Sequence, residues 1–116
     1  MALNRGNLGF TTQIGAGVTA AVYTVGSAQT AYIKSVLVHN LSLTGTQNVK
    51  LHLVPNAGTA SSTTQIARIG ISTNDTFFFE PAYPITLPTT GDTLQVYNEG
   101  VVSDSVNILV LGDKEV

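Results

Sequence analysis

The fold is decided by the stretch Ala31-Tyr-Ile-Lys-Ser-Val-Leu-Val-His-Asn40 together with the run Gln47-Asn-Val-Lys-Leu-His-Leu-Val-Pro55, which follows it after a short loop. Both runs are dense in β-branched residues and are bounded by residues typical of turns. In the second run the residues alternate, so that Leu51 and Lys50 point to opposite faces of a strand. Gly45 in the loop can take the positive φ that a hairpin connection requires. The two runs therefore predict the central hairpin of an all-β domain.

Short runs of strand-forming residues, separated by turn signals, continue along the whole chain. They cover residues 10–14, 18–25, 65–71, 76–80, 93–98 and 105–111. Three prolines within residues 81–88 place that segment at a sheet edge or in a loop between sheets. Residues 113–116 are expected to form a charged tail, and no segment has helical periodicity. The pattern predicts a single antiparallel β-sandwich of about seven to eight short strands, with jelly-roll or immunoglobulin-like topology.

Residues 1–17 are expected to form an extended N-terminal arm, and residues 18–116 the sandwich domain. The arm is rich in glycine, which raises the entropic cost of ordering its backbone. Its apolar residues are too sparse to bury one another, yet a segment surrounded only by solvent would not need them: Leu3, Leu8, Phe10 and Ile14. We therefore expect the arm to lie along a neighbouring subunit that supplies the missing burial, with Phe10 as an anchor.

The composition indicates a single domain that associates with other protein. The chain has 116 residues, of which 43% are hydrophobic and only 10% are charged. Little charge repulsion keeps copies of the chain apart, which favours close packing against other protein. The net charge is −2 and the five basic residues are scattered, which argues against a nucleic-acid partner. No apolar run reaches the length of a signal peptide or a membrane span, so we expect no membrane partner and synthesis in the cytoplasm.

The residues that carry enzymatic chemistry are few and form no recognisable motif. Cysteine is absent, and no Gly-x-Ser-x-Gly sequence accompanies the two histidines, His39 and His52. The histidines also lack the short spacing of a two-histidine metal site. The aspartates lie in turns such as Asn74-Asp75, where aspartate usually bonds its own backbone; a calcium site in these turns is the weaker alternative. We therefore predict a protein that is not an enzyme and has no catalytic residues, no metal and no cofactor.

The aromatic residues indicate a contact surface. If Phe77 and Phe79 face the core, Phe78 faces outward in the neighbourhood of Tyr83. No convergent polar groups accompany Phe78, so a subunit interface is favoured over a ligand pocket such as a sugar-binding platform. The predicted interface consists of the apolar residues Leu3, Leu8, Phe10, Phe78 and Tyr83.

Strand and turn segments recur in a particular order along the chain: Val22–Val25, Thr30–Asn40, Val49–Pro55, Asn74–Thr76, Gly91–Leu94 and Val106–Ile108. This order resembles that of small β-sandwich virion proteins of tailed bacteriophages. The resemblance extends over residues 20–112 and includes no catalytic motif. It implies a structural subunit that is present in many copies in the virion and is assembled in the host cytoplasm.

The resemblance implies, more narrowly, a capsid decoration or cement protein that stabilises the head by binding over major capsid subunits. Its expected partners are further copies of the chain, as a homotrimer, and the major capsid protein or other virion proteins. A tail, baseplate or fibre component is the alternative within the same class. A carbohydrate-binding β-sandwich module is the rival from a different class, because such modules often carry surface aromatic residues.

The predicted core gives a test of the strand faces. It consists of Ile33, Leu37, Val49, Leu51, Leu53, Ile69, Phe77, Phe79, Leu94, Val96, Ile108 and Val110. Leu51→Ala is expected to lower the free energy of unfolding by about 2–5 kcal/mol, because it truncates a buried side chain. Lys50→Ala, on the opposite face, is expected to change it by less than about 0.5 kcal/mol. Chemical denaturation measures both values, and equal effects would show that the faces are assigned wrongly.

Overall fold

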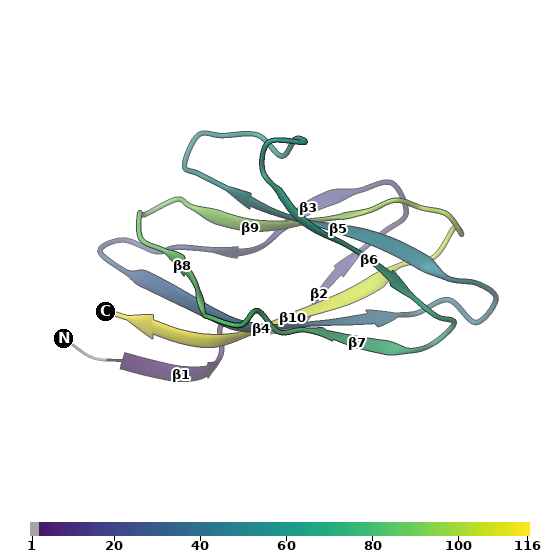
Figure 1. Cartoon of the computed structure of the whole chain (residues 1–116), viewed down its shortest axis with the longest axis horizontal. Coiled ribbons are helices and arrows are strands. Elements are labelled where there is room, and N and C mark those ends of the chain that lie inside the picture. Colours follow the sequence, from purple (N-terminus) through teal and green to yellow (C-terminus); the bar gives the residue numbers. More distant parts are fainter. Residues whose placement is uncertain (1–2) are drawn as a thin grey trace.

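The computed structural model describes residues 3–116, in which strands, turns and loops occur without a helix. Two antiparallel sheets face each other as a sandwich (Figure 1), which confirms the predicted fold class. The strands of the described part are β1 (Leu3–Asn7), β2 (Thr12–Ile14), β3 (Thr19–Thr24), β4 (Thr30–Asn40), β5 (Gln47–Val54), β6 (Gln65–Ile71), β7 (Thr76–Phe79), β8 (Ile85–Leu87), β9 (Thr93–Asn98) and β10 (Val106–Glu115).

The order of the strands identifies the topology. Sheet A has the order β1-β10-β4-β7, with β2 also paired to β10 and β8 also paired to β4, and sheet B has the order β3-β9-β5-β6. If β1 with β2 and β7 with β8 are each treated as one interrupted edge strand, consecutive strands lie in opposite sheets, apart from the paired strands β5 and β6. Two four-stranded sheets linked in this way form a jelly roll. The sequence left both the jelly-roll and the immunoglobulin-like topology open, and the strand order is that of the jelly roll.

The core lies between the two sheets. Its buried members are Ile14, Tyr23, Val25, Ala31, Ile33, Val36, Val38, Val49, Leu51, Ile69, Ile71, Leu87, Leu94, Val96, Val106, Ile108 and Val110. Paired residues share a face, as Leu51 and Val96 do in sheet B. Most of the predicted core residues are therefore confirmed, while Leu53 and Phe79 are only partly buried against this cluster.

The hairpin predicted over residues 31–55 is wrong in its pairing. Both strands exist close to the expected bounds, but β4 lies in sheet A and β5 in sheet B. Asn40, at the end of β4, is fully buried, and its side-chain nitrogen donates to the carbonyl oxygens of Gly45 (2.9 Å) and Ile71 (3.0 Å). Its Oδ1 accepts from the backbone N–H of Ser42 (2.8 Å). These bonds hold the loop across the end of the sandwich, so the chain passes from one sheet to the other.

A bulge in β4 exchanges the faces of that strand. The register with β10 shifts between Leu111 and Gly112, which leaves Lys34 as the extra residue. Without the bulge, alternation would put Leu37 on the same face as Ile33. The prediction that Leu37 belongs to the core is therefore wrong, because the bulge turns its side chain to the outer face of sheet A.

Residues 3–17 contribute two strands to the sandwich. β1 pairs with the end of β10 and β2 with its beginning, and between them the backbone N–H of Leu8 donates to the carbonyl of Val110 (2.9 Å). Ile14 is a core residue, and Leu8 packs against the core. The expectation that this segment finds too little burial in its own chain is therefore wrong for these residues. Phe10 is 95% exposed, and its role as an anchor on a neighbour stays a prediction.

The aromatic strand β7 has the predicted facing but less burial. Phe79 pairs with Val36 and Phe77 with Val38, so both phenylalanines lie on the inner face of sheet A. Phe77 is nevertheless 42% exposed, and its assignment to the core is wrong. The physical reason is that β7 is an edge strand, which has no neighbour on its far side to complete the burial.

The proline segment and the C-terminus contain more strand than expected. Within residues 81–88, β8 pairs with β4 at the sheet edge. Residues 113–115 do not form the predicted charged tail, because they continue β10 and pair with both β1 and β4. Backbone pairing on both sides therefore orders a segment whose charged side chains suggested solvent.

Gly112 lies opposite the bulge and gives a test of the packing there. A Cβ atom at this position would collide with the carbonyl oxygen of Tyr32 and would lie 3.1 Å from the Cα of Ile33. Gly112→Ala is therefore expected to lower the free energy of unfolding by about 1–3 kcal/mol, because the neighbouring backbone must move. The control is Gly15→Ala, where the nearest atom to a Cβ is 4.0 Å away. Urea denaturation measures both, and an equal effect would show that β4 accommodates the methyl group.

Candidate interaction surface

The two histidines bond to hydroxyl groups in separate sheets. Nδ1 of His39 lies 2.8 Å from Oγ1 of Thr76, across the β4–β7 pair of sheet A. Nδ1 of His52, in sheet B, lies 3.0 Å from Oγ1 of Thr64. These contacts hold each ring in place, and the structure does not bring the two histidines together.

The aspartates in turns bond to nearby backbone, as the turn pattern predicts. The carboxylate of Asp92 accepts from the backbone N–H groups of Asn56 (2.9 Å) and Thr89 (3.0 Å), and Asp75 accepts from that of Thr76 (2.8 Å). Within residues 3–116, no three His, Cys, Asp or Glu side chains gather where they could hold a metal ion. The same residues include no helix long and apolar enough to cross a membrane.

The predicted interface residues do not form one patch. Phe10 and Tyr83 are 95% and 85% exposed, and Leu3 and Phe78 are about half exposed, whereas Leu8 packs against the core. Leu3 lies in β1 at one edge of sheet A, and Phe78 lies in β7 at the other edge. The fold therefore does not bring all five residues into a single contact surface.

Phe78 instead ends a continuous apolar row across the outer face of sheet A. Leu109 of β10 pairs with Leu37 of β4, and Leu37 pairs in turn with Phe78 of β7. The Cβ atoms of such pairs lie about 4.5–5.5 Å apart, so the three side chains are neighbours. The two leucines are partly exposed and Phe78 is half exposed. We call these residues the outer apolar row, because a two-layer sandwich usually carries polar residues on this side.

Sequence reasoning missed two of the three residues in this row. Unbroken alternation assigns Leu37 to the core, and it gives Leu109 no role at the surface. The available signal was that residues 105–111 are apolar on both faces. In a sandwich of two sheets only one face of a strand meets the core, so the other apolar face has no partner within the fold.

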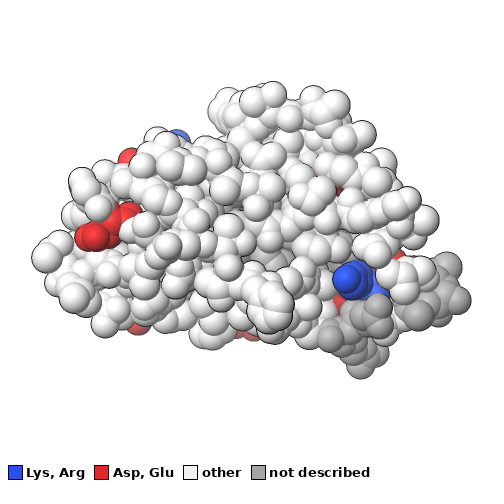
Figure 2. All heavy atoms as spheres, turned by 180° about the vertical axis from the view of Figure 1, so that it is seen from behind, with Lys and Arg blue, Asp and Glu red and all other residues white. Residues whose placement is uncertain are grey.

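Polar contacts lie farther along sheet A, near the end of β10. Nζ of Lys34 lies 2.7 Å from Oδ2 of Asp113. The hydroxyl of Tyr32 donates to Oε1 of Glu115 (2.9 Å), and this hydrogen bond, together with desolvation, raises the pKa of Tyr32. Charges are otherwise sparse: Figure 2 shows one side of the molecule with a few isolated charged groups on a largely uncharged surface.

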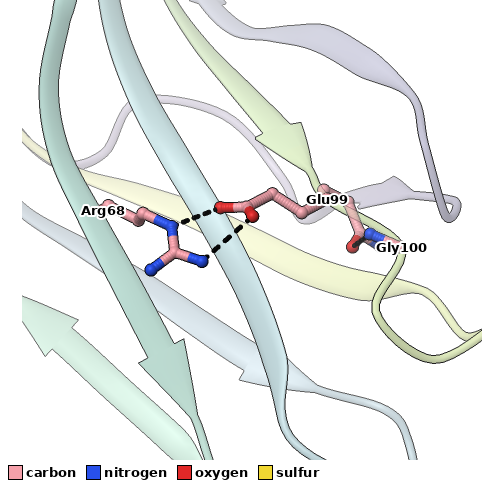
Figure 3. Close-up of polar contacts among 4 residues, drawn as sticks. Arg68, Glu99 and Gly100 are labelled. Atoms are coloured by element: carbon pink, nitrogen blue, oxygen red, sulfur yellow. Dashed lines mark hydrogen bonds and ion pairs between the residues drawn. The ribbon is translucent and has the colours of Figure 1, made fainter.

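The outer face of sheet B has a different chemistry. Arg68 of β6 reaches across β5 to Glu99, directly after β9 (Figure 3). Its Nε and Nη2 lie 2.8 Å and 3.1 Å from the two carboxylate oxygens, so the contact is bidentate. The hydrogen bond from Arg68 lowers the pKa of Glu99, and the same bond raises the pKa of Arg68. The pair joins two strands that are not neighbours in the sheet.

A hollow of about 260 Å³ opens on this face, under the loop between β5 and β6, which rises above sheet B at the top of Figure 1. Its lining consists of Thr19, Lys50, His52, Ala60, Ser61, Ser62, Gln65 and Tyr97. Nζ of Lys50 lies 5.9 Å from the centroid of the Tyr97 ring. The lining combines one ammonium group, one imidazole and several hydroxyl groups, and it includes no carboxylate.

Comparison with known proteins gives a likeness of fold. No family model and no curated protein matches the sequence. The structure is similar to a chain of the T13 particle of infectious bursal disease virus, with 14% identity and a TM-score of 0.51 over 97% of this chain and 30% of that one. It is also similar to a chain of the nora virus structure, with 13% identity and a TM-score of 0.51 over 96% of this chain and 59% of that one. The chain spans less than two thirds of either relative, and what it shares with them is the β-sandwich fold.

Proposed function

We propose that this chain is a non-enzymatic structural subunit of a virus particle. Within that class, we propose a decoration protein that stabilises a bacteriophage head by binding over its major capsid subunits. The observation that carries the proposal is the outer apolar row of Leu109, Leu37 and Phe78. An apolar row on the outside of a two-layer sandwich stays in contact with water unless further protein covers it. In a subunit of a larger assembly, neighbouring protein provides that cover.

The first partner that we propose for the row is a second copy of the chain. Only 10% of the residues are charged, so like charges oppose the approach of two copies weakly. Closed symmetry would place the same row at every interface of a homo-oligomer. The resemblance to phage decoration proteins favours a trimer among the possible states. Several weak contacts to the shell then add up, because a trimer docks through all its subunits at once.

The fold likeness supports this proposal. Jelly rolls occur in viral capsids but also in lectins and cupins, so the fold alone does not define a function. The two similar structures described above both come from viruses. The order of strand and turn segments in the sequence, which resembles phage virion proteins, favours the same class. A tail, baseplate or fibre position is the alternative within it.

Self-association of the purified chain tests the role of the row. We expect a mass near three times the 12.1 kDa of one chain by light scattering. Phe78→Glu should weaken this association at least about tenfold, because it places a charge in the apolar contact. The monomer fold should be kept, since Phe78 is half exposed on an edge strand.

The matched control is Ile66→Glu, which adds the same charge at a 40% exposed apolar residue on β6, the edge strand of the opposite sheet. We expect this variant to associate as the unmodified chain does. A chain that is monomeric at all concentrations, or an equal loss in both variants, would contradict the proposed contact.

Cryo-electron microscopy of the particle that carries the protein tests its position. We expect density for the chain on the outside of the head, over joints between major capsid subunits, with sheet A turned toward protein. Density in the tail, baseplate or fibres would support the alternative. A particle with density for the chain in none of these places would contradict both.

A further inference from the structure

The geometry points to a second functional surface, in which the hollow on the outer face of sheet B is a binding site for a saccharide that bears a carboxylate. This inference goes beyond the structural role proposed above and does not depend on it. It follows from where the lining residues lie, how the wall is fixed, and which charged group the lining contains.

Two adjacent rows of sheet B form the floor of the hollow. Thr19, Tyr97 and Lys50 are directly paired across β3, β9 and β5, and His52 is paired with Gln65 across β5 and β6. Paired residues share a face of the sheet, so these side chains stand next to one another. The floor therefore places an aromatic ring beside an ammonium group, a hydroxyl group, an imidazole and an amide.

The wall of the hollow is fixed before any ligand is bound. The backbone N–H of Thr64 donates to the carbonyl of Ser61 (3.1 Å), and the Thr64 hydroxyl oxygen accepts from the N–H of Ser61 (2.9 Å). The carbonyl of Thr64 accepts from the N–H of Leu53 (2.9 Å), which ties the turn to β5. A preformed wall reduces the entropy that is lost when a ligand binds.

Thr64 also holds the ring of His52 in the hollow. The Thr64 hydroxyl oxygen lies 3.0 Å from the carbonyl oxygen of Ser61 and 3.0 Å from Nδ1 of His52. His52 lines the hollow and is only 5% exposed, so its imidazole is a fixed polar part of the floor.

Lys50 supplies the positive charge of the hollow. The neighbouring cation, Arg68, is engaged by both oxygens of Glu99. Nζ of Lys50 lies over the ring of Tyr97, and no aspartate or glutamate belongs to the lining. The pKa of Glu99 is lowered mainly by its hydrogen bond from Arg68 and also by the charge of Lys50, so Glu99 lies near Lys50 but is already engaged by Arg68. An acidic group in the hollow would thus meet one ammonium group and no carboxylate in the lining itself.

A carboxylated saccharide matches this set of groups. The hydroxyl groups of Thr19 and Ser61 and the amide of Gln65 can bond sugar hydroxyls, and the ring of Tyr97 offers a flat apolar surface to the C–H groups of a sugar ring. Lys50 pairs with the carboxylate through a charge-assisted hydrogen bond. A nucleic acid would require several cations along its backbone, whereas the hollow has one lysine.

Titration of the full chain with 3′-sialyllactose and with glucuronic acid, followed by NMR of the backbone amides, tests this site. We expect saturable shifts at residues 60–65 and at Lys50 and Tyr97. Lactose and glucose, which lack the carboxylate, should bind at least about tenfold more weakly. Lys50→Ala should reduce the affinity for the acidic sugars to that for the neutral ones.

The control is Lys114→Ala, which removes the same charge from sheet A and should leave binding unchanged. Thermal melting of each variant separates a loss of binding from a loss of fold. The proposal is overturned if neither acidic sugar shifts these residues or if both lysine variants lose binding equally. It is also overturned if sodium acetate shifts the same residues with equal affinity, because the hollow would then bind any anion.

Discussion

The pairing of β4 with β10 is the contact on which the rest of the structure depends. The two strands lie at the centre of sheet A, with β1 and β2 on one side and β7 and β8 on the other. Their register sets both faces at once: Val38 pairs with Ile108 toward the core, and Leu37 pairs with Leu109 toward the outside. A slip by one residue would exchange these faces. Gly112 opposes such a slip, because a Cβ atom opposite the bulge would collide with the carbonyl oxygen of Tyr32.

The bounds of most strands could be predicted from the sequence, but their partners could not. The expected strands 65–71 and 93–98 match β6 and β9, because alternation and turn residues are local signals. Pairing is decided by contacts between distant parts of the chain. Gly45 permits a turn after β4 but does not determine whether the chain returns in the same sheet. The side-chain bonds of Asn40 hold the loop that carries the chain to the other sheet, and one of them reaches Ile71, which no local pattern connects to it.

The candidate surfaces, too, could be predicted only where they depend on local sequence patterns. The outward position of Phe78 could be predicted from the parity of three consecutive phenylalanines. The outward position of Leu37 could not, because it depends on a bulge that appears only in the register of β4 with β10. The hollow could not be predicted from the sequence either, since Thr19, Lys50 and Tyr97 come from three strands that only the sheet order brings together.

The two outer faces of the sandwich point in opposite directions, as the upper and lower layers of Figure 1 show. The face of sheet A carries the outer apolar row, whose burial by further protein would be favourable. The face of sheet B carries an ion pair and a hollow lined by polar groups, which water solvates well. A subunit that is attached through sheet A therefore keeps sheet B open to solution. Many copies on one particle would present many such hollows, and a weak affinity at each would then sum to firm attachment to a surface that displays the ligand.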